Sequence, residues 1–154
     1  MADTDLLNTI VGVAPGSALA ALRAQRPQIQ QHTQGSYDVL LSPDDPGGLT
    51  PAERALVAQR VAALAGHAAL AAHYQTLLAA RGAPAPGPRC DAIVAHAERL
   101  ATAPGSATRA HLAVLAGVGL AARDIVALSQ LVAFVAYQVR AAVGLSLLAR
   151  ERAA

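Results

Sequence analysis

"TPAERALVAQRVAALAGHAALAAHYQTLLAAR", residues 50–81, decides the fold class of this chain. It opens with a strong helix-start signal: Thr50 is a preferred N-cap residue, Pro51 suits the first helical position, and Glu53 stands where a capping box needs an acid. Apolar residues then recur with a 3.6-residue period, and alanine, the best helix former, dominates. The stretch predicts a helix over residues 50–81, with Gly66 as the place where it would kink.

The same helical period runs through most of the remaining sequence, and strand patterns are nearly absent. Further helices are expected at residues 5–11, 17–26, 27–41, 90–101, 107–116 and 122–150. SPDDPGG, residues 42–48, and RGAPAPGPR, residues 81–89, are clear connectors because proline and glycine break helices. We predict an all-α fold and one domain over residues 1–154, with residues 1–47 as an N-terminal helical extension and residues 48–150 as the core.

The composition is unusually apolar for a chain of 154 residues. Hydrophobic residues make up 54% of the sequence, whereas charged residues make up 14% and aromatic residues 3%. So few charges would hardly cover the surface of a monomer, and part of the apolar excess should therefore lie between subunits. We expect a homo-oligomer.

The charged residues and the cysteine exclude several classes of function. The net charge of +2 comes from 12 scattered arginines without any lysine, so nucleic-acid binding is not expected and Schiff-base chemistry on lysine is excluded. Cys90 is the only cysteine, which excludes an intrachain disulfide and a cysteine-rich zinc site. Arg89 and a helix N-terminus would lower the pKa of the Cys90 thiol, but without a partner thiol we expect Cys90 to be a bystander.

The sequence predicts neither export nor membrane insertion. It starts with the acidic MADTDLL, whereas a signal peptide would carry positive charge before an apolar run. The longest uncharged run, residues 61–80, has the length of a membrane span, but it holds His67, His73, Gln75 and Thr76. Those polar side chains favour a buried helix of a soluble protein, and we expect a cytoplasmic location.

An internal repeat relates two parts of the chain. GLTPAERALVAQRVAA, residues 48–63, aligns without gaps with GLAARDIVALSQLVAF, residues 119–134. The Gly-Leu pairs coincide, and Glu53 coincides with Asp124. The alignment predicts two related helical units that pack together.

Two segments carry a resemblance to a known family. PAERALVAQRVAALAGHAALAAHY, residues 51–74, followed by GLAARDIVALSQLVAFVAYQVRAAVGL, residues 119–145, is similar to the alkylhydroperoxidase D and carboxymuconolactone decarboxylase superfamily. The resemblance covers about residues 15–148 and is closer to bacterial members with an N-terminal segment like HTQGSYDVLLSPDDPGGLT, residues 32–50. It implies an all-α, alkylhydroperoxidase D-like fold whose helical pairs assemble into dimers, trimers or hexamers. Members include thiol peroxidases and a cofactor-free decarboxylase.

The redox motif of the resembling peroxidases is missing. Those members carry E-x-x-C-x-x-C-x-x-x-H on the long helix. With the histidine of the motif set on His73, its cysteines fall on Gly66 and Ala69 and its glutamate falls on Ala63. Both sulfurs and the relay acid are absent, so thiol peroxidase activity is not expected.

His67 and His73 are the first candidates for a site. They are six residues apart, which is about 120° around a helix, whereas a metal-binding pair on one helix needs a spacing of three or four residues. No such pair occurs in the sequence, so neither a metal nor another cofactor is expected. Two interpretations of His73 stay open: a general base or substrate-orienting group in an apolar pocket, or a half-buried histidine bonded to a helix carbonyl.

Glu53, Arg60 and His67 recur every seven residues and would form one stripe on a continuous helix. As a pocket lining, the stripe would offer an acid, an anion-binding guanidinium and an imidazole. The alternative, which we favour, is a polar face at a packing seam with Glu53 as a capping residue.

Gln130, Tyr137 and Arg140 share one face of the last predicted helix, at spacings of seven and three residues. Buried tyrosine and glutamine need hydrogen-bond partners, and arginine needs an anion. These side chains either face His73 across a pocket or pair with one another at an interface.

The candidate residues lead to hypotheses of different classes. The first is cofactor-free acid–base chemistry on a small organic acid or lactone, in which His73 moves a proton and Arg60 or Arg140 binds the carboxylate. The alternatives are a non-catalytic oligomeric protein that binds a small molecule or a partner enzyme, and the peroxidase-type activity that the resemblance implies. A cavity that joins His73 to an arginine and a second titratable group would favour the enzyme. The candidates are His73, Glu53 and Tyr137 for catalysis, and Arg60, His67, Gln130 and Arg140 for substrate binding.

Overall fold

The predicted all-α fold is confirmed in the computed structural model, which describes residues 5–151 and has no strand among them. Its helices are α1 (Leu6–Val11), α2 (Ala18–Ala24), α3 (Pro27–Leu41), α4 (Pro51–Leu64), α5 (Ala68–Arg81), α6 (Pro88–Thr102), α7 (Arg109–Gly117) and α8 (Ala122–Glu151). A short 3₁₀ turn, η1 (Pro104–Ser106), lies between α6 and α7.

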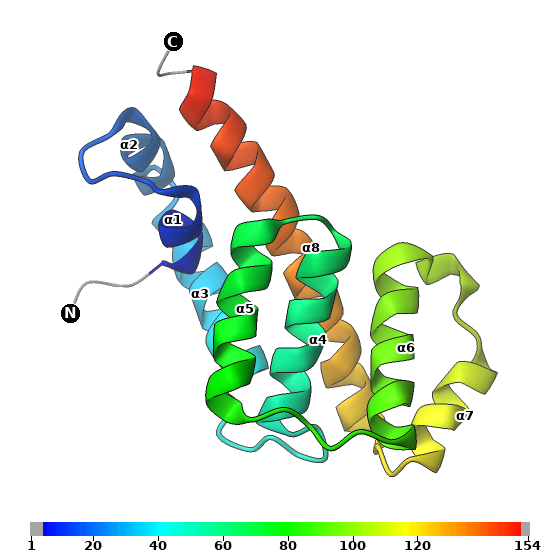
Figure 1. Ribbon diagram of the computed structural model, residues 1–154. Helices are drawn as coiled ribbons and strands as arrows, with labels where there is room; N and C mark the ends of the chain where they lie inside the picture. Colours follow the sequence, from blue (N-terminus) through cyan, green and yellow to red (C-terminus); the bar gives the residue numbers. More distant parts are fainter. Residues whose placement is uncertain (1–4, 152–154) are drawn as a thin grey trace.

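The helix α8 is the long element against which the others pack (Figure 1). The antiparallel pair α4–α5 lies against its N-terminal half through α4, with α6 beside α4 and α7 outside α6. The helices α1, α2 and α3 pack against α8 from another side. The last turns of α8 extend past the α4–α5 pair, where α2 is their neighbour.

The single helix predicted over residues 50–81 is wrong, because the chain turns back at Gly66 and forms a helical hairpin. Gly66 adopts a φ of +72°, a left-handed conformation that glycine tolerates best. Its N–H donates to the Ala63 carbonyl at 3.0 Å, and the His67 N–H donates to the Ala62 carbonyl at 3.1 Å. This pair of bonds is a Schellman motif, which ends α4 rather than kinking it.

The helix start predicted at Thr50 is confirmed in detail. The Thr50 hydroxyl accepts a hydrogen bond from the Glu53 N–H at 3.2 Å, and the Glu53 carboxylate accepts one from the Thr50 N–H at 2.8 Å. Both bonds satisfy backbone donors that a helix N-terminus leaves without an intrahelical partner.

The N-terminal extension and the predicted core segment bury side chains in the same apolar cluster. Leu7 of α1 and Leu41 of α3 belong to it, and both are almost fully buried. Residues 48–150 supply most of the rest, including Leu49, Val57, Val61, Leu70, Tyr74, Ile93, Leu115, Leu128, Leu131 and Val135. The burial of Leu7 and Leu41 ties the extension to the body of the molecule by the hydrophobic effect.

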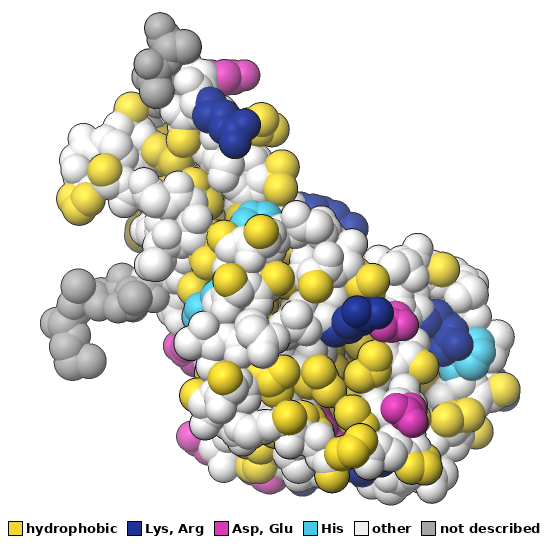
Figure 2. All heavy atoms as spheres, viewed as in Figure 1, with side chains coloured by type: hydrophobic (Ala, Val, Ile, Leu, Met, Phe, Trp, Pro, Cys, Tyr) yellow, Lys and Arg dark blue, Asp and Glu magenta, His cyan; other side chains and the backbone are white. Residues whose placement is uncertain are grey.

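The surface is poor in charge, as the composition requires. On the face shown in Figure 2, the charged side chains are scattered among apolar and small groups. Within residues 5–151, α8 alone has the length and mean hydropathy, 1.8, of a membrane span, and 39% of its most apolar stretch is buried. Core helices of soluble proteins share these properties, so the feature is weak evidence for a membrane.

Candidate functional site

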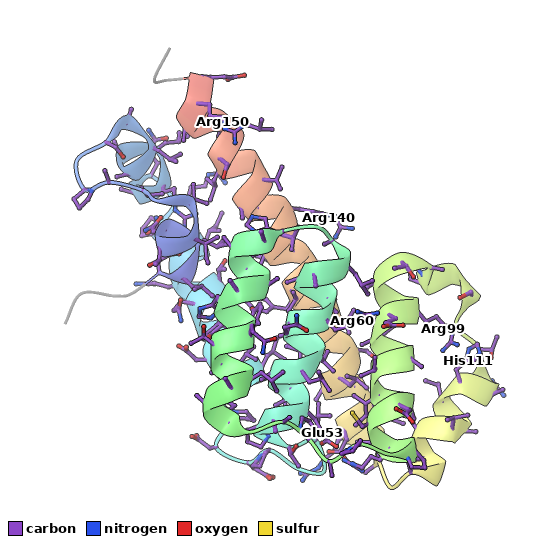
Figure 3. The ribbon with its side chains drawn as sticks, in the orientation of Figure 1. Glu53, Arg60, Arg99, His111, Arg140 and Arg150 are labelled. Carbon is purple, nitrogen blue, oxygen red and sulfur yellow. The ribbon has the colours of Figure 1, made fainter. Side chains whose placement is uncertain are left out.

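Glu53, at the start of α4 (Figure 3), is the buried partner of an ion pair with the partly exposed Arg89. Its side chain is almost fully buried, and Arg89 Nε donates to its Oε1 at 2.7 Å while the Thr50 N–H donates to Oε2. Burial alone would raise the pKa of Glu53, but the bonds from Arg89 and Thr50 outweigh it and hold the pKa below its usual value. A carboxylate that is charged and bonded on both oxygens is poorly suited to proton transfer at neutral pH, so the geometry favours a capping role.

The start of α8 repeats the arrangement at the start of α4. Asp124 Oδ2 accepts from the Ala121 N–H at 2.9 Å, three residues earlier, and Oδ1 accepts from the Gly48 N–H at 2.9 Å. The Gly48–Asp124 bond joins the two starts, and Arg89 reinforces the junction, because its guanidinium donates to the carbonyls of Gly48, before α4, and Val118, at the end of α7. The internal repeat therefore has a structural counterpart: in each half, an acid bonds the backbone N–H three residues before it.

The predicted stripe of Glu53, Arg60 and His67 is not formed, because α4 ends before His67. Arg60 Nε donates to Glu98 Oε1 of α6 at 2.5 Å on an exposed face. His67 is the N-cap residue of α5, where its Nδ1 accepts from the Leu70 N–H at 3.3 Å. The three side chains thus have separate partners and do not line one pocket.

His73 pairs with a tyrosine that the sequence analysis did not single out. Its Nε2 lies 2.9 Å from the Tyr37 hydroxyl of α3, and both side chains are half-buried. Burial lowers the pKa of His73 and raises the pKa of Tyr37, although the positive charge of Arg81 acts against the latter shift. A neutral imidazole is thereby held against a protonated phenol. His73 bonds a side chain rather than the helix carbonyl that the second interpretation named.

Behind this pair, a buried tyrosine and glutamine connect α5 to α8. The Tyr74 hydroxyl donates to Gln138 Oε1, and both side chains are fully buried. The Tyr74 ring lies edge-on to His73 and stacks with Tyr37 at a centroid distance of 6.3 Å. Burial raises the pKa of Tyr74 far above its usual value, so it stays protonated.

Tyr137 and Arg140 lie elsewhere, in a hollow of about 690 Å³ between the C-terminal half of α8 and the segment from α2 to α3, here called the α8 groove. Its apolar lining includes Leu22, Ile29, Ala141, Leu145, Leu147 and Leu148. The Tyr137 hydroxyl lies 3.1 Å from Thr33 Oγ1, which also lines the groove. His73 is not part of its lining, so the groove does not join His73 to an arginine.

One face of α3 connects the groove with the histidine pair. Ile29, Thr33 and Tyr37 follow one another at intervals of four residues, which places them on the same side of the helix. Ile29 and Thr33 line the groove, and Tyr37 bonds His73. The two features therefore stand at neighbouring levels of α3 without forming one cavity.

Gln130 is separated from Tyr137 and Arg140. It lines a shallower hollow on the α3–α8 surface together with His32, Ser36 and Phe134. The face that the sequence predicts for Gln130, Tyr137 and Arg140 is thus divided between two depressions.

Cys90 lies in the first turn of α6, at the helix N-terminus that the sequence predicts, but its thiol does not have the lowered pKa expected there. Burial, followed by the charges of Asp91 and Glu53, raises the pKa of its thiol. Arg89 donates its hydrogen bonds to Glu53 and to backbone carbonyls instead of stabilising a thiolate. The expectation of a lowered pKa is wrong because the neighbouring arginine is already paired.

Several residues of these features escaped sequence reasoning. Tyr37, Arg23 and Arg26 carry no motif, and their roles depend on how α2 and α3 pack against the other helices. Tyr37 had one usable signal, because an aromatic residue with a hydroxyl is often buried against a polar partner. Within residues 5–151, no three histidine, cysteine or acidic side chains gather as metal ligands would.

Comparisons with known proteins show a similarity of fold. No family model and no curated protein matches the chain. Among solved structures, the chain is similar to an uncharacterized peroxidase-related protein from Silicibacter sp. TM1040, with a TM-score of 0.58 and 21% sequence identity. The similarity covers 75% of this chain and 66% of the other, just under two thirds of its length. At this identity the likeness is one of fold.

Proposed function

We propose that the chain is a member of the alkylhydroperoxidase D and carboxymuconolactone decarboxylase superfamily that lacks redox cysteines and binds a small organic molecule. The superfamily assignment is supported by the sequence resemblance and by the description of the structural neighbour as peroxidase-related. The α4–α5 hairpin, which bears the motif histidine, is consistent with it.

The α8 groove is the observation that carries the proposal of binding. Its volume of about 690 Å³ falls within the range of about 300–1,000 Å³ that is usual for small-molecule pockets. The lining is mostly apolar and has a few polar groups, among them Tyr137 and Arg140. Because the groove excludes His73, it favours binding over acid–base catalysis.

A pair of glycine substitutions tests binding in the groove. Gly144 lines the groove within α8, and a Cβ placed there meets no other atom within 4 Å. Gly144→Leu should therefore fill the groove without straining the backbone. Gly117→Leu at the end of α7, where a Cβ is equally free, is the matched control.

The probe is N-phenylnaphthylamine, a neutral fluorophore that brightens in apolar pockets. Wild type and Gly117→Leu should show saturable fluorescence enhancement, and Gly144→Leu should lose most of it. A wild-type protein without saturable enhancement, or an unchanged response in Gly144→Leu, would contradict binding in this groove.

Peroxide reduction through a dithiol cycle is not expected. A peroxidase needs a low-pKa thiolate and, in the C-x-x-C design, a second thiol to resolve the sulfenic acid. Any residual consumption of an alkyl hydroperoxide should disappear in Cys90→Ser, since this variant has no thiol. Robust turnover in Cys90→Ser would show that the activity does not depend on thiol chemistry.

Two cysteine pairs, built in Cys90→Ser, test superfamily membership. With the motif histidine on His73, the cysteines replace Gly66 and Ala69. If the motif is placed one residue further along the chain, the cysteines replace His67 and Leu70. The first cysteine then occupies the N-cap position of α5, and a helix N-terminus lowers the pKa of a thiol. At least one pair should oxidise to a disulfide, as measured by loss of free thiol. If neither does, the placement of the motif on this hairpin is wrong.

We also propose a homo-oligomer. Large apolar side chains are exposed on α7 and α8, among them Leu112, Val114, Val126 and Val143, and such patches often cover one another between subunits. Light scattering at micromolar concentration should give a multiple of 15.6 kDa. A single monomer peak would contradict the proposal.

Acid–base chemistry at His73 is the second candidate, favoured by the 2.9 Å contact with Tyr37. The neutral imidazole would take a proton from a small organic acid or lactone, and the phenol would hold the ring. His73→Gln should then abolish turnover of a lactone panel, whereas Tyr37→Phe should reduce it. Equal turnover in wild type and His73→Gln would exclude this role.

A further inference from the structure

The α8 groove combines an apolar wall with an excess of positive charge. Three arginines line it, Arg23, Arg26 and Arg140, against the single acid Glu151. The lining side chains sum to +2 at neutral pH, and Asp5, which is paired with Arg23, reduces this excess to +1. A positive excess in an apolar hollow attracts an anion that also has apolar surface to bury.

Two of these arginines have no counter-ion. Within residues 5–151, no carboxylate lies within ion-pair distance of Arg26 or Arg140. Both side chains are exposed. Among the described residues, the exposed Arg109 and Arg150 also have no ion pair, whereas Arg60 and Arg123 are paired with Glu98 and Asp45. Arg26 and Arg140 thus bring two exposed guanidinium groups, with no ion pair among the described residues, to the lining of one groove.

Arg23 adds a buried donor without a partner. Its Nη2 is paired with Asp5 Oδ2 at 2.5 Å, and its side chain is 11% exposed. Its Nε is buried and, among the described residues, has no hydrogen-bond acceptor. A buried N–H without an acceptor costs free energy, and a shift of the Arg23 side chain toward the groove would let a ligand oxygen recover it.

We infer that the α8 groove binds a single-chain amphipathic anion, a carboxylate of the fatty-acid type. The alkyl chain would lie on Leu22, Ile29 and Leu148, and the arginines would attract the carboxylate. This inference rests on the proposed function, because it names the class of ligand for the same groove.

A second copy of the chain is a less suitable occupant. In a two-fold contact the same face meets itself, so Arg26 and Arg140 of each copy would be brought toward the arginines of the other. The two positively charged linings would repel one another unless a further anion intervened. A small anion instead neutralises the excess.

The test compares three single-chain amphiphiles of equal chain length by isothermal titration below their micelle concentrations: dodecanoate, dodecanol and dodecyltrimethylammonium. Dodecanoate should bind wild type with a stoichiometry near one, and at least about tenfold more tightly than the other two, as expected for a charge-assisted contact. The binding should weaken at high salt because exposed charges are screened.

Variants locate the interaction. Arg26→Gln with Arg140→Gln should weaken dodecanoate binding about tenfold or more and should leave dodecanol binding unchanged. Arg109→Gln, an exposed arginine at the start of α7 outside the groove, is the control and should bind as wild type does. Gly144→Leu should lose both ligands.

The outcomes distinguish binding in the α8 groove from the preference for an anionic ligand. Equal binding of dodecanoate and dodecanol, abolished by Gly144→Leu, would overturn the anionic class and leave binding in the groove standing. Binding that persists in Gly144→Leu, or no binding at all, would overturn both. Capture of the protein by anionic phospholipid vesicles, without binding of dodecanoate, would overturn the inference in favour of a membrane surface.

Discussion

The two ends of α8 use arginine in opposite ways. At the N-terminal end, Arg89 donates to Glu53 and to two backbone carbonyls, and it ties the start of α4 to the end of α7, just before α8. At the other end, Arg26 and Arg140 line an apolar groove, and no carboxylate of residues 5–151 lies within ion-pair distance of either. Polar groups that bond one another stabilise the fold, whereas donors left over in a hollow mark a surface for a ligand.

The largest expected effect concerns the paired end. Arg89→Met would leave the Glu53 carboxylate with only its bond from the Thr50 N–H, and the free energy of unfolding should fall by about 2–3 kcal/mol, less than for a fully buried pair because Arg89 is partly exposed. The matched control is Arg60→Met, which removes an exposed ion pair and should cost about 1 kcal/mol or less. Urea denaturation measures both. Equal losses of unfolding free energy in the two variants would show that the Arg89–Glu53 pair contributes no more to stability than the exposed Arg60–Glu98 pair.

The next effect depends on close packing at the same end. A Cβ at Gly48 would lie 2.5 Å from Asp124 Oδ2, so Gly48→Ala must displace the carboxylate that bonds the Gly48 N–H. Thermal unfolding should show a loss of about 1–3 kcal/mol. An unchanged melting temperature would mean that this contact is looser than the structure describes.

At the groove end of α8, a glycine-to-alanine substitution should raise the stability of the protein instead of lowering it. Gly144→Ala meets no other atom and replaces a helix-interior glycine, so it should stabilise the protein by up to about 1 kcal/mol. The measurement is again urea denaturation. Destabilisation would show that the backbone near Gly144 needs the freedom of glycine.

The smallest expected effect is a dependence of stability on pH. Burial lowers the folded-state pKa of His73 and His96, so the unfolded chain binds more protons in the mildly acidic range. Stability should therefore be full above the unfolded value of about 6.5 and fall as the pH drops through the lower folded values. His96→Gln should flatten this slope, and His32→Gln, an exposed control, should keep it.

Glu53 also makes the protein more stable at higher pH, but over a lower pH range than the histidines. Its folded pKa is held below the unfolded value, so its contribution is present above that value and is lost as the pH falls through the folded pKa. Acid unfolding of Glu53→Gln should accordingly be shallower than that of wild type. Identical acid profiles would contradict the role of the Arg89 pair.

The sequence by itself determined the features that depend on neighbours a few residues away. The capping box of Thr50 and Glu53 was predictable because its bonds join residues three apart. The all-α class followed from the 3.6-residue period, and the repeat that pairs Glu53 with Asp124 was readable as a pattern although its meaning was not. The fold explains the repeat: each acid bonds the backbone N–H three residues before it, and Asp124 also bonds the Gly48 N–H near the start of α4.

The tertiary structure decided which helical residues meet. The same apolar period continues on both sides of Gly66, so local propensity did not distinguish a kink from a hairpin, and packing of α5 back on α4 settled the turn. It likewise separated His67 from Glu53, paired His73 with Tyr37 and placed Arg140 in the groove. These contacts join residues distant in the sequence, and in a chain of alanine-rich helices no local pattern specifies which faces come together.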